Sequence, residues 1–386
     1  MGRIGKIYKK KDECCGCAAC AQICPHNAIH MCEDNEGFSY PQIDKTKCVG
    51  CGLCKNVCPI INAPEKNDEV KKCYIAYCKN EEIRLNSSSG GIFTVLAEKI
   101  LEQDGIVIGA AFDDNWMVKH ICVSNKGDLA KLRGSKYVQS DTNEVFKQAK
   151  NYLQEGKKVL FSGTECQVSG LKAFLNKEYE NLFTVDVLCH GVPSPKVWDK
   201  YVREKDTYKD AKIENINMRN KDVGWKNFSV KITYEDSTTN REVYHKNEYM
   251  NLFLSNICLR PSCYNCKFKR LQRNSDVTIG DCWGIENYMP DMDDDKGSSV
   301  VMIHTDKGEQ LWKSIESKLC YKEAKKDKAL SPMADSRKSV EAHINRKPLF
   351  KLINKNKTVK ELVNKIDVSF FERVKRKGRN IIKKLS

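Results

Sequence analysis

Eight cysteines near the N-terminus form two runs with the same spacing, and they constrain this chain more than any other feature. The runs read Cys14-x2-Cys17-x2-Cys20-x3-Cys24-Pro25 and Cys48-x2-Cys51-x2-Cys54-x3-Cys58-Pro59. Spacers this short let one loop supply three thiolates to the corners of a small iron–sulfur cube, and the proline turns the chain away after the fourth. The pattern therefore predicts two [4Fe–4S] clusters.

The spacing is typical of bacterial ferredoxins, in which the fourth cysteine of each run ligates the other cluster. We assign Cys14, Cys17, Cys20 and Cys58 to one cluster (cubane I) and Cys48, Cys51, Cys54 and Cys24 to the other (cubane II). Zinc sites usually pair two C-x2-C units, and disulfides need an oxidising compartment, which no signal peptide indicates here. Cys15 and Cys32 fall outside the pattern and are interpreted as bystanders.

Composition bounds the rest of the chain. Its 386 residues predict two or three domains, and 40% hydrophobic residues are enough for a buried core. No apolar run approaches the roughly 20 residues of a membrane span. Twenty cysteines without a targeting segment favour a reducing cytoplasm in which thiols serve as metal ligands.

The net charge of +15 is concentrated at the C-terminus. Residues 321–386 hold 20 Lys and Arg against 7 Asp and Glu, whereas residues 1–320 hold 46 against 44. Each oxidised cubane with four thiolates carries a further charge of about −2. We therefore expect an acidic redox body and a strongly basic tail.

Hydrophobic patterning predicts an α/β middle. Strands are expected at residues 73–78 and 106–112, with a helix at 92–101 between them. Residues 158–162, 168–175 and 182–188 read as a strand, a helix and a strand, a βαβ crossover whose two strands should be parallel. Further strands are expected at residues 213–219, 228–234, 277–280 and 299–304, and a helix near Lys307.

A second group of cysteines lies in this middle region. Cys166 and Cys189 each follow a strand of the βαβ unit, so both thiols can face one crevice at the strand ends. With the Cys263-x2-Cys266 pair they predict a third [4Fe–4S] cluster. Cys258, Cys263 and Cys266 also match plant-type [2Fe–2S] spacing, with Cys282 as the fourth ligand, and spacing alone leaves a zinc ribbon or inert cysteines open.

Several ordered motifs resemble one known family. They are Ser88-Ser89-Gly90-Gly91 with Phe93-Thr94, Arg133-Gly134-Ser135-Lys136-Tyr137 with Gln139-Ser140, Gly163-Thr164-Glu165-Cys166-Gln167, Cys189-His190-Gly191-Val192-Pro193-Ser194, Leu259–Cys266 and Gly280-Asp281-Cys282-Trp283-Gly284. Over roughly residues 1–320 they resemble the coenzyme F420 hydrogenase/dehydrogenase beta-subunit family, in the bacterial form with an N-terminal 2[4Fe–4S] ferredoxin domain.

The resemblance implies an FAD beside one [4Fe–4S] cluster, and it favours Cys166, Cys189, Cys263 and Cys266 as that cluster's ligands. The family usually has proline where this chain has Glu165. Flavin contacts carry over onto Ser88, Ser89, Gly90, Gly91, Thr94, Lys136, Tyr137 and Ser140. A Ser/Gly loop that opens a helix offers free N–H groups to an anion, although it also serves as an ordinary helix cap.

Two residues are candidates for catalysis. Lys136 can stabilise a reduced anionic flavin, or it can be a solvated lysine. His190 can donate a proton beside the flavin, or it can hydrogen-bond within its own turn. Arg219, Lys221 and Trp225 resemble another family loop and are expected to face the substrate.

We therefore expect an α+β and α/β architecture in four parts. Residues 1–62 form the ferredoxin module, 72–150 the flavin-loop region, 151–325 the α/β region with the third cluster, and 326–386 a basic helical tail. In residues 370–386 apolar positions fall along one side of a helix among seven Lys and Arg. That side suits packing on the body, an acidic redox partner or peripheral membrane contact; nucleic acid is not expected, since no recognition motif accompanies the charge.

The expected function is a cytoplasmic iron–sulfur flavoprotein oxidoreductase. Electrons would pass between a partner, such as a ferredoxin or another oxidoreductase subunit, and a small organic molecule, through three clusters and FAD. Coenzyme F420 is one candidate substrate. The alternative is a flavin-free electron-relay subunit that serves a separate enzyme, because no general acid–base pair is evident in the sequence.

Overall fold

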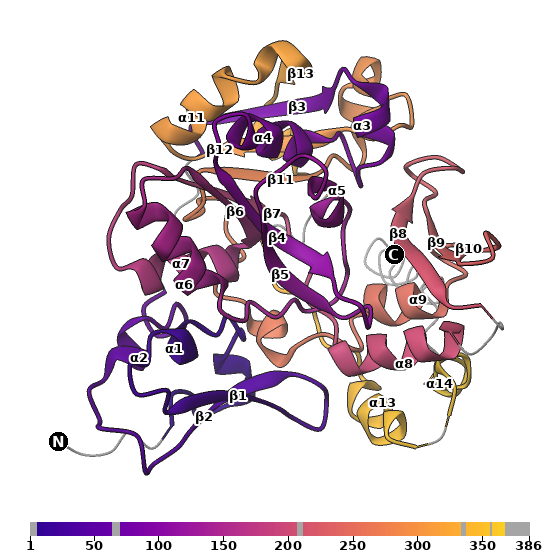
Figure 1. The fold of residues 1–386 in the computed structure, drawn as a ribbon. Coiled ribbons are helices and arrows are strands. Elements are labelled where there is room, and N and C mark those ends of the chain that lie inside the picture. The colour runs from indigo at the N-terminus through magenta and orange to yellow at the C-terminus, as the bar shows by residue number, and fades with distance from the viewer. Residues whose placement is uncertain (1–5, 64–69, 207–210, 333–336, 356, 367–386) are drawn as a thin grey trace, which may run out of the picture.

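The computed structural model describes residues 6–63, 70–206, 211–332, 337–355 and 357–366. Three β-sheets organise these residues: a two-stranded sheet, a three-stranded sheet and an eight-stranded sheet. Figure 1 shows the ferredoxin module in indigo beneath α6 and α7, which lie beside the eight-stranded sheet.

The ferredoxin module (residues 6–63) is a hairpin with short helical turns that carry its cysteines. The antiparallel strands pair Ile29 with Ile43 and Glu33 with Ser39. Buried Cys20 and Cys54 pack on Ile29 between the two halves. The elements are η1 (Lys11–Glu13), α1 (Ala19–Gln22), β1 (Ile29–Glu33), β2 (Ser39–Ile43) and α2 (Leu53–Asn56).

The eight-stranded sheet forms the centre of the body. Its four middle neighbours, β11, β7, β6 and β4, run parallel, and the outer strands pair antiparallel. The predicted βαβ crossover is confirmed, since β6 and β7 are parallel from Val159↔Leu182 to Thr164↔Val187. In spatial order the strands are β13 (Leu319–Glu323), β3 (Lys72–Cys78), β12 (Ser299–Ile303), β11 (Val277–Asp281), β7 (Leu182–Val187), β6 (Val159–Thr164), β4 (Ile106–Phe112) and β5 (Val118–Val123).

Helices cover both faces of this sheet, because side chains of the central strands alternate between two cores. Val159 and Phe161 of β6 pack with α6 (Val145–Gln154) and α7 (Glu165–Leu175). Leu160 packs instead with α4 (Ile92–Leu101) and α11 (Asp306–Lys313). Both faces are therefore hydrophobic, as in other sheets flanked by helices. Short helices α3 (Glu81–Leu85) and α5 (Leu129–Leu132) lie in the same half of the chain.

The three-stranded antiparallel sheet packs on an aromatic core of its own. Trp198, Tyr201 and Tyr249 are buried there between two helices, α8 and α9. Leu349 and Leu362 bring the C-terminal helices α13 and α14 into the same core. The elements are α8 (Pro195–Asp206), β8 (Ile213–Asn220), β9 (Ser229–Tyr234), β10 (Thr239–Val243), α9 (Glu248–Leu254), α13 (Arg346–Ile353) and α14 (Val359–Ile366).

Most predicted elements are present, some with bounds shifted by a few residues. Strands β1 and β2 of the hairpin were not predicted, nor were β5, β10 and β13; the last three are edge strands, whose short, half-exposed patterns carry a weak signal. The basic tail contains α12 (Lys326–Ala329), α13 and α14, and the predicted helix at residues 370–386 lies outside the described residues. No described helix is long and apolar enough to cross a membrane. The remaining elements are η2 (Pro261–Asn265), α10 (Ile285–Tyr288), η3 (Pro290–Met292) and η4 (Glu316–Lys318).

Candidate functional site

The cysteines predicted for cubane II surround one small cavity. Cys24, Cys48, Cys51 and Cys54 all line it, so the crossing cysteine of the first run does lie with the second run. In the set predicted for cubane I, Cys14 and Cys58 are the cysteines that interact most strongly with Cys20, and both raise the pKa of its thiol. The donor sets therefore fit two cubanes with exchanged fourth ligands.

These thiols are not arranged for a single metal ion. Among the residues that the structure describes, no three His, Cys, Asp or Glu side chains converge closely enough to ligate one ion. A cubane instead needs four thiolates spread around a cluster.

Cys166, Cys189, Cys263 and Cys266 (the third cysteine group) lie together at the ends of β6 and β7. Cys263 is influenced electrostatically by Cys189, Cys266 and Cys166, and its sulfur accepts a hydrogen bond of 3.4 Å from the Val192 N–H. Burial raises the pKa of Cys189 to about 12. Metal coordination, which deprotonates a thiol outright, would therefore be needed to form a thiolate here.

The competing plant-type set is not brought together. Cys258 is buried in the aromatic core of α8 and α9, whereas Cys282 packs in a separate core with Cys73. The geometry therefore supports the four-cysteine group over the set with Cys258 and Cys282.

The ferredoxin module docks directly against this third cysteine group. The Cys15 thiol interacts electrostatically with Cys166, so Cys15, which the sequence pattern left as a bystander, lies where the module meets the third cysteine group. Gly170 of α7 lies so close to Cys17 that a Cβ added there would stand 2.9 Å from its sulfur. The Cys17 carbonyl accepts a hydrogen bond of 2.9 Å from Thr142. The cysteines predicted for cubane I therefore lie on the side of the module that faces the body.

Arg260 joins the two cysteine groups. Its side chain is fully buried and stacks on Tyr40. Its guanidinium donates to the Cys14 carbonyl at 2.8 Å and approaches the Cys14 sulfur at 3.6 Å. Cys263 also contributes to its electrostatic environment. One buried cation therefore lies between Cys14, a predicted ligand of cubane I, and Cys263 of the third cysteine group.

Further positive charge surrounds the third cysteine group. Lys269 is buried and donates to the Cys189 carbonyl. Arg273 pairs with Asp186 at 3.1 Å, and both side chains are buried. Glu165, the departure from the family pattern, begins α7, accepts the Asn274 N–H at 2.9 Å and lies 3.7 Å from Arg270. Cations on this side offset the charge that a cluster of four thiolates would carry.

A cavity of about 560 Å³ opens beside the third cysteine group. Cys189 and His190 line it, and so do seven of the eight residues predicted to contact flavin. The seven are Ser88, Ser89, Gly91, Thr94, Lys136, Tyr137 and Ser140. This volume is within the range of small-molecule and cofactor sites.

Gly90 is the predicted flavin residue that does not line the cavity. Its N–H donates to Ser299 at 3.0 Å, and a Cβ at this position would lie 2.5 Å from the Ala76 carbonyl oxygen. Glycine is therefore required by close approach to β3. Gly91, with φ of +84°, begins α4 without a side-chain cap, which leaves the first-turn N–H groups available to an anion at the cavity.

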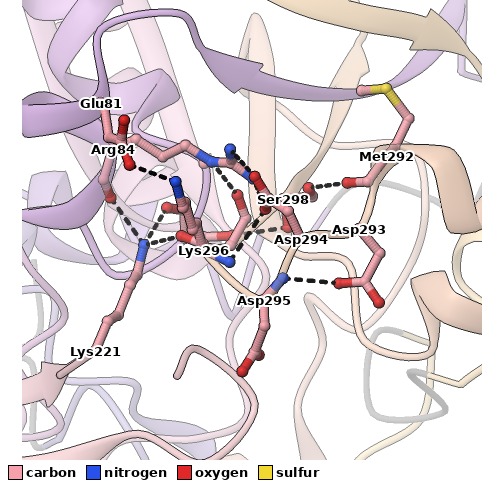
Figure 2. A network of polar contacts seen from close by, with 12 residues as sticks. Glu81, Arg84, Lys221, Met292, Asp293, Asp294, Asp295, Lys296 and Ser298 are labelled. Atoms are coloured by element: carbon pink, nitrogen blue, oxygen red, sulfur yellow. Dashed lines mark hydrogen bonds and ion pairs between the residues drawn. The ribbon is translucent and has the colours of Figure 1, made fainter. Parts of the chain in front are cut away.

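The Ser/Gly loop (Asn86–Gly91) is held in place by a buried lysine. Lys221 donates to the carbonyl oxygens of Arg84, Ser89 and Lys296 at 2.8, 2.6 and 2.7 Å. Arg84 in turn donates to Gly297 and pairs with Asp294. Figure 2 shows the Lys221 ammonium bonded to the backbone carbonyls of Arg84 and Lys296, and the Lys296 ammonium paired with Glu81. Lys221 therefore positions the loop and does not line the cavity, contrary to the sequence-based prediction.

Trp225 is also placed away from the cavity. It is fully buried and stacks on Trp283 with ring centroids 4.8 Å apart. Arg219, the third member of that prediction, does line the cavity. It pairs with Asp281 at 2.7 Å and donates to the Tyr137 hydroxyl at 2.8 Å. Its Nε is buried without a hydrogen-bond partner among the described residues.

Lys136 lines the cavity next to this group. Its ammonium donates to the carbonyl oxygens of Arg133 and Gly134 at 3.0 and 3.1 Å. Part of the side chain is exposed to the cavity, but protein surrounds the cavity, and burial lowers the pKa of Lys136 to about 7. A change in nearby charge can therefore shift its protonation near neutral pH.

A buried histidine that sequence reasoning missed supports Ser140. His120 lies with Nε2 3.0 Å from the Ser162 carbonyl and Nδ1 2.7 Å from the Ser140 hydroxyl oxygen. Burial lowers its pKa to about 4, so the ring is neutral. Because a carbonyl only accepts, Nε2 carries the proton and the Ser140 hydroxyl donates to Nδ1. The Ser140 oxygen is left to accept a hydrogen bond from a ligand N–H.

His190 occupies the cavity wall nearest Cys189. Its Nε2 lies 2.6 Å from the Asn256 side-chain oxygen, and its ring meets the edge of Phe253. With an amide oxygen as acceptor, Nε2 carries the proton. The ring is oriented by Asn256 and lines the cavity together with Cys189.

Three family models match the chain. A 4Fe-4S dicluster domain matches residues 13–61. The other two describe the N-terminal and the C-terminal part of the coenzyme F420 hydrogenase/dehydrogenase beta subunit, and they match residues 73–147 and 156–329.

Solved structures include a distant relative. A chain from the xenon-derivatised F420-reducing [NiFe] hydrogenase complex of Methanosarcina barkeri is 20% identical, with a TM-score of 0.46, and the match covers 80% of this chain and 95% of that one. No curated protein matches the chain.

Proposed function

Because the chain belongs to the coenzyme F420 hydrogenase/dehydrogenase beta-subunit family and carries a 4Fe-4S dicluster domain, we propose that it is an iron–sulfur flavoprotein oxidoreductase. It passes electrons between a protein partner and a small organic molecule, for which coenzyme F420 is one candidate. We place it in the cytoplasm on account of its many cysteines. The family fixes the reaction type more closely than the substrate.

The observation that carries this proposal is a single cavity bordered by two kinds of residue. Residues of the Ser/Gly loop and of the 133–140 segment line it, and so does Cys189 of the third cysteine group. FAD bound there would connect two-electron chemistry on a substrate with one-electron transfer to iron–sulfur clusters. A cubane held by the third cysteine group would lie directly beside it.

The residues of this chain have distinct roles at such a site. The uncapped start of α4 and Lys136 bind negative charge. Tyr137, held by Arg219, orients one wall, and its ring stacks on Phe253 at 4.8 Å. Ser140, oriented by His120, accepts an N–H, and His190 holds a proton at Nε2. The contact of Cys15 with Cys166 brings the cubane I side against the third group.

Acid release of the chromophore from anaerobically purified protein tests the flavoprotein proposal. Stoichiometric FAD is expected. If no flavin is released, and none rebinds when FAD is added, the flavoprotein proposal fails and the chain is an electron-relay subunit for a separate enzyme.

Iron content tests the third cluster independently. Three cubanes predict about twelve irons per chain after reconstitution, and Cys263→Ser should reduce the count to about eight. Cys282→Ser is the matched control, since Cys282 lies in another core and its loss should leave the count unchanged. A wild-type count that stays at about eight would rule out the third cluster.

A further inference from the structure

The two cubane sites face different surroundings. Cubane I is enclosed by α7, Arg260 and Thr142 of the body. Cubane II lies at the surface: Cys51, one of its ligands, is the one cysteine classed as exposed among those that the structure describes. Cubane II therefore has the side more open to a partner, and an electron taken up there can pass through cubane I to the body.

Apolar side chains gather around this exposed cluster site. Val49 and Leu53 line its cavity together with the cysteines, yet they are 54% and 39% exposed. Ile61 is 51% exposed and lies beside the end of α2, because the Asn62 amide donates to the Lys55 and Asn56 carbonyls at 3.0 and 2.9 Å. Large exposed hydrophobics are rare in this chain, and three of the seven among the described residues occur within residues 49–61.

The rim of this apolar patch is basic. Lys45, Lys47 and Lys55 are all exposed, and Asp44 is the single acidic residue between positions 44 and 63. Asp44 lies 4.0 Å from Lys47, at the limit of an ion pair. An apolar centre with a charged rim is the usual anatomy of a protein interface, and a rim of one sign selects partners of the opposite sign.

We propose that this surface (Lys45, Lys47, Val49, Leu53, Lys55 and Ile61, the cubane II face) is the docking site for a small acidic protein that carries one electron at a time. The patch is small, which suits the brief encounters of electron-transfer proteins. The proposal rests on the proposed electron-transfer function, and it adds the site of exchange and the charge of the partner.

The test uses the reconstituted full chain and a reduced plant-type [2Fe–2S] ferredoxin, an acidic one-electron carrier. Stopped-flow measurement of cluster bleaching should give a rate constant that falls as salt is added. The triple variant Lys45→Glu, Lys47→Glu, Lys55→Glu should react on the order of 10- to 100-fold more slowly at low salt. Reduction by dithionite should stay within about twofold, which shows that the clusters are intact.

A matched triple variant controls for net charge. Lys177→Glu, Lys322→Glu and Lys328→Glu make the same change on exposed lysines of other elements and should leave the rate within about threefold. Leu53→Gln should slow the reaction at every salt concentration, because it removes apolar contact. Equal slowing by both triple variants, or a wild-type rate independent of salt, would overturn the proposal. Since only the clusters are followed, these outcomes do not depend on whether FAD is bound.

Discussion

Arg260 illustrates how a single side chain joins the ferredoxin module to the body. Its guanidinium is fully buried and satisfied by the Cys14 carbonyl, by Gln139 at 2.8 Å and by the Ser39 carbonyl at 3.0 Å. No carboxylate pairs with it among these contacts. Its natural counter-charge is therefore the net negative charge of cubane I, and a buried cation near a cluster favours the reduced state.

Arg260→Gln should lower the reduction potential of cubane I by on the order of 50–100 mV, because one nearby positive charge is lost at low effective dielectric. Potentiometric titration followed by electron paramagnetic resonance measures this shift. Arg260→Lys retains the charge and should shift the potential by less than half as much. Cubane II, on the far side of the module, provides an internal reference. Equal shifts in both cubanes would point to a general loss of structure.

The lowered pKa of Lys136 leads us to expect that ligand binding depends on pH. Because burial lowers its pKa to about 7, its charge is lost as the pH rises through that value. Affinity for FAD, which is anionic, should therefore fall up to about tenfold from about one pH unit below to one above. Fluorescence titration measures the dissociation constant, and Lys136→Met should remove the dependence. Lys131→Met, an exposed lysine of α5, should retain it.

The contribution of Lys136 to folding stability changes with pH in the opposite direction to its contribution to FAD binding. An unfolded chain protonates this lysine up to its ordinary pKa of 10.5, whereas the folded, ligand-free protein releases the proton above about 7. The unfolded state thus binds more protons in this window. This residue's contribution to the free energy of unfolding should therefore rise with pH between these values.

The Ser/Gly loop, which forms part of the cavity lining, is held by Lys221, a residue outside the cavity. Burial lowers the pKa of Lys221 to about 7, yet its three carbonyl partners match the three N–H donors of the charged form. The Ser89 carbonyl of the loop points at this ammonium, and Lys221 thereby ties the loop to the Arg84 and Lys296 carbonyls on either side. The cavity wall is thus shaped by a residue that does not touch it.

Lys221→Met should destabilise the protein by about 1–3 kcal/mol, because buried carbonyls lose their donor. It should also weaken FAD binding at least roughly tenfold. Denaturant unfolding and flavin titration measure the two effects. Lys79→Met, which removes an exposed lysine bond to the Ser317 carbonyl, should change stability by less than about 0.5 kcal/mol. Unchanged flavin affinity in Lys221→Met would show that the loop holds its shape without this support.

Sequence patterns were sufficient to predict the elements that depend on the hydrophobic period of neighbouring residues. The β6–α7–β7 crossover follows from buried strands and a helical apolar period, and it places Cys166 and Cys189 at neighbouring strand ends. His120 and Cys15 carry no such signal. Their roles come from contacts with Ser140 and Cys166, which are distant in sequence, and no spacing rule reports a tertiary neighbour. Gly90 was predicted to contact flavin, but it does not line the cavity and lies against the Ala76 carbonyl of β3, a tertiary neighbour that its motif does not report.

At the scale of the whole molecule, the C-terminal region fastens the ferredoxin module to the body. Arg346 of α13 forms paired hydrogen bonds with the Glu36 carboxylate of the hairpin at 2.8 and 2.5 Å. The same guanidinium donates to the Leu259 carbonyl at 3.0 Å, just before the Cys263–Cys266 loop. Ser339 accepts the Cys266 N–H at 2.9 Å. The C-terminal region thus supports both the hairpin and the third cysteine group.

Arg346→Met should loosen this junction, with a loss of about 1–3 kcal/mol of stability, because a mostly buried charge pair is broken and Glu36 is left alone. Hydrogen exchange should increase in residues 29–43 more than in the eight-stranded sheet. Arg337→Met removes an exposed pair with Asp327 and should have little effect. Exchange that rises equally throughout the protein would argue against a local role.

The contact between Arg346 and Glu36 can form only late in synthesis of the chain. The two residues are 310 positions apart, so at about 5–20 residues per second roughly 15–60 s pass between their emergence from the ribosome. Throughout that interval the hairpin has been made but its fastening has not, and Arg260 arrives only late within it. The cysteines that lie between the module and the body are therefore accessible to iron delivery during synthesis. The contact made by α13 forms only afterwards.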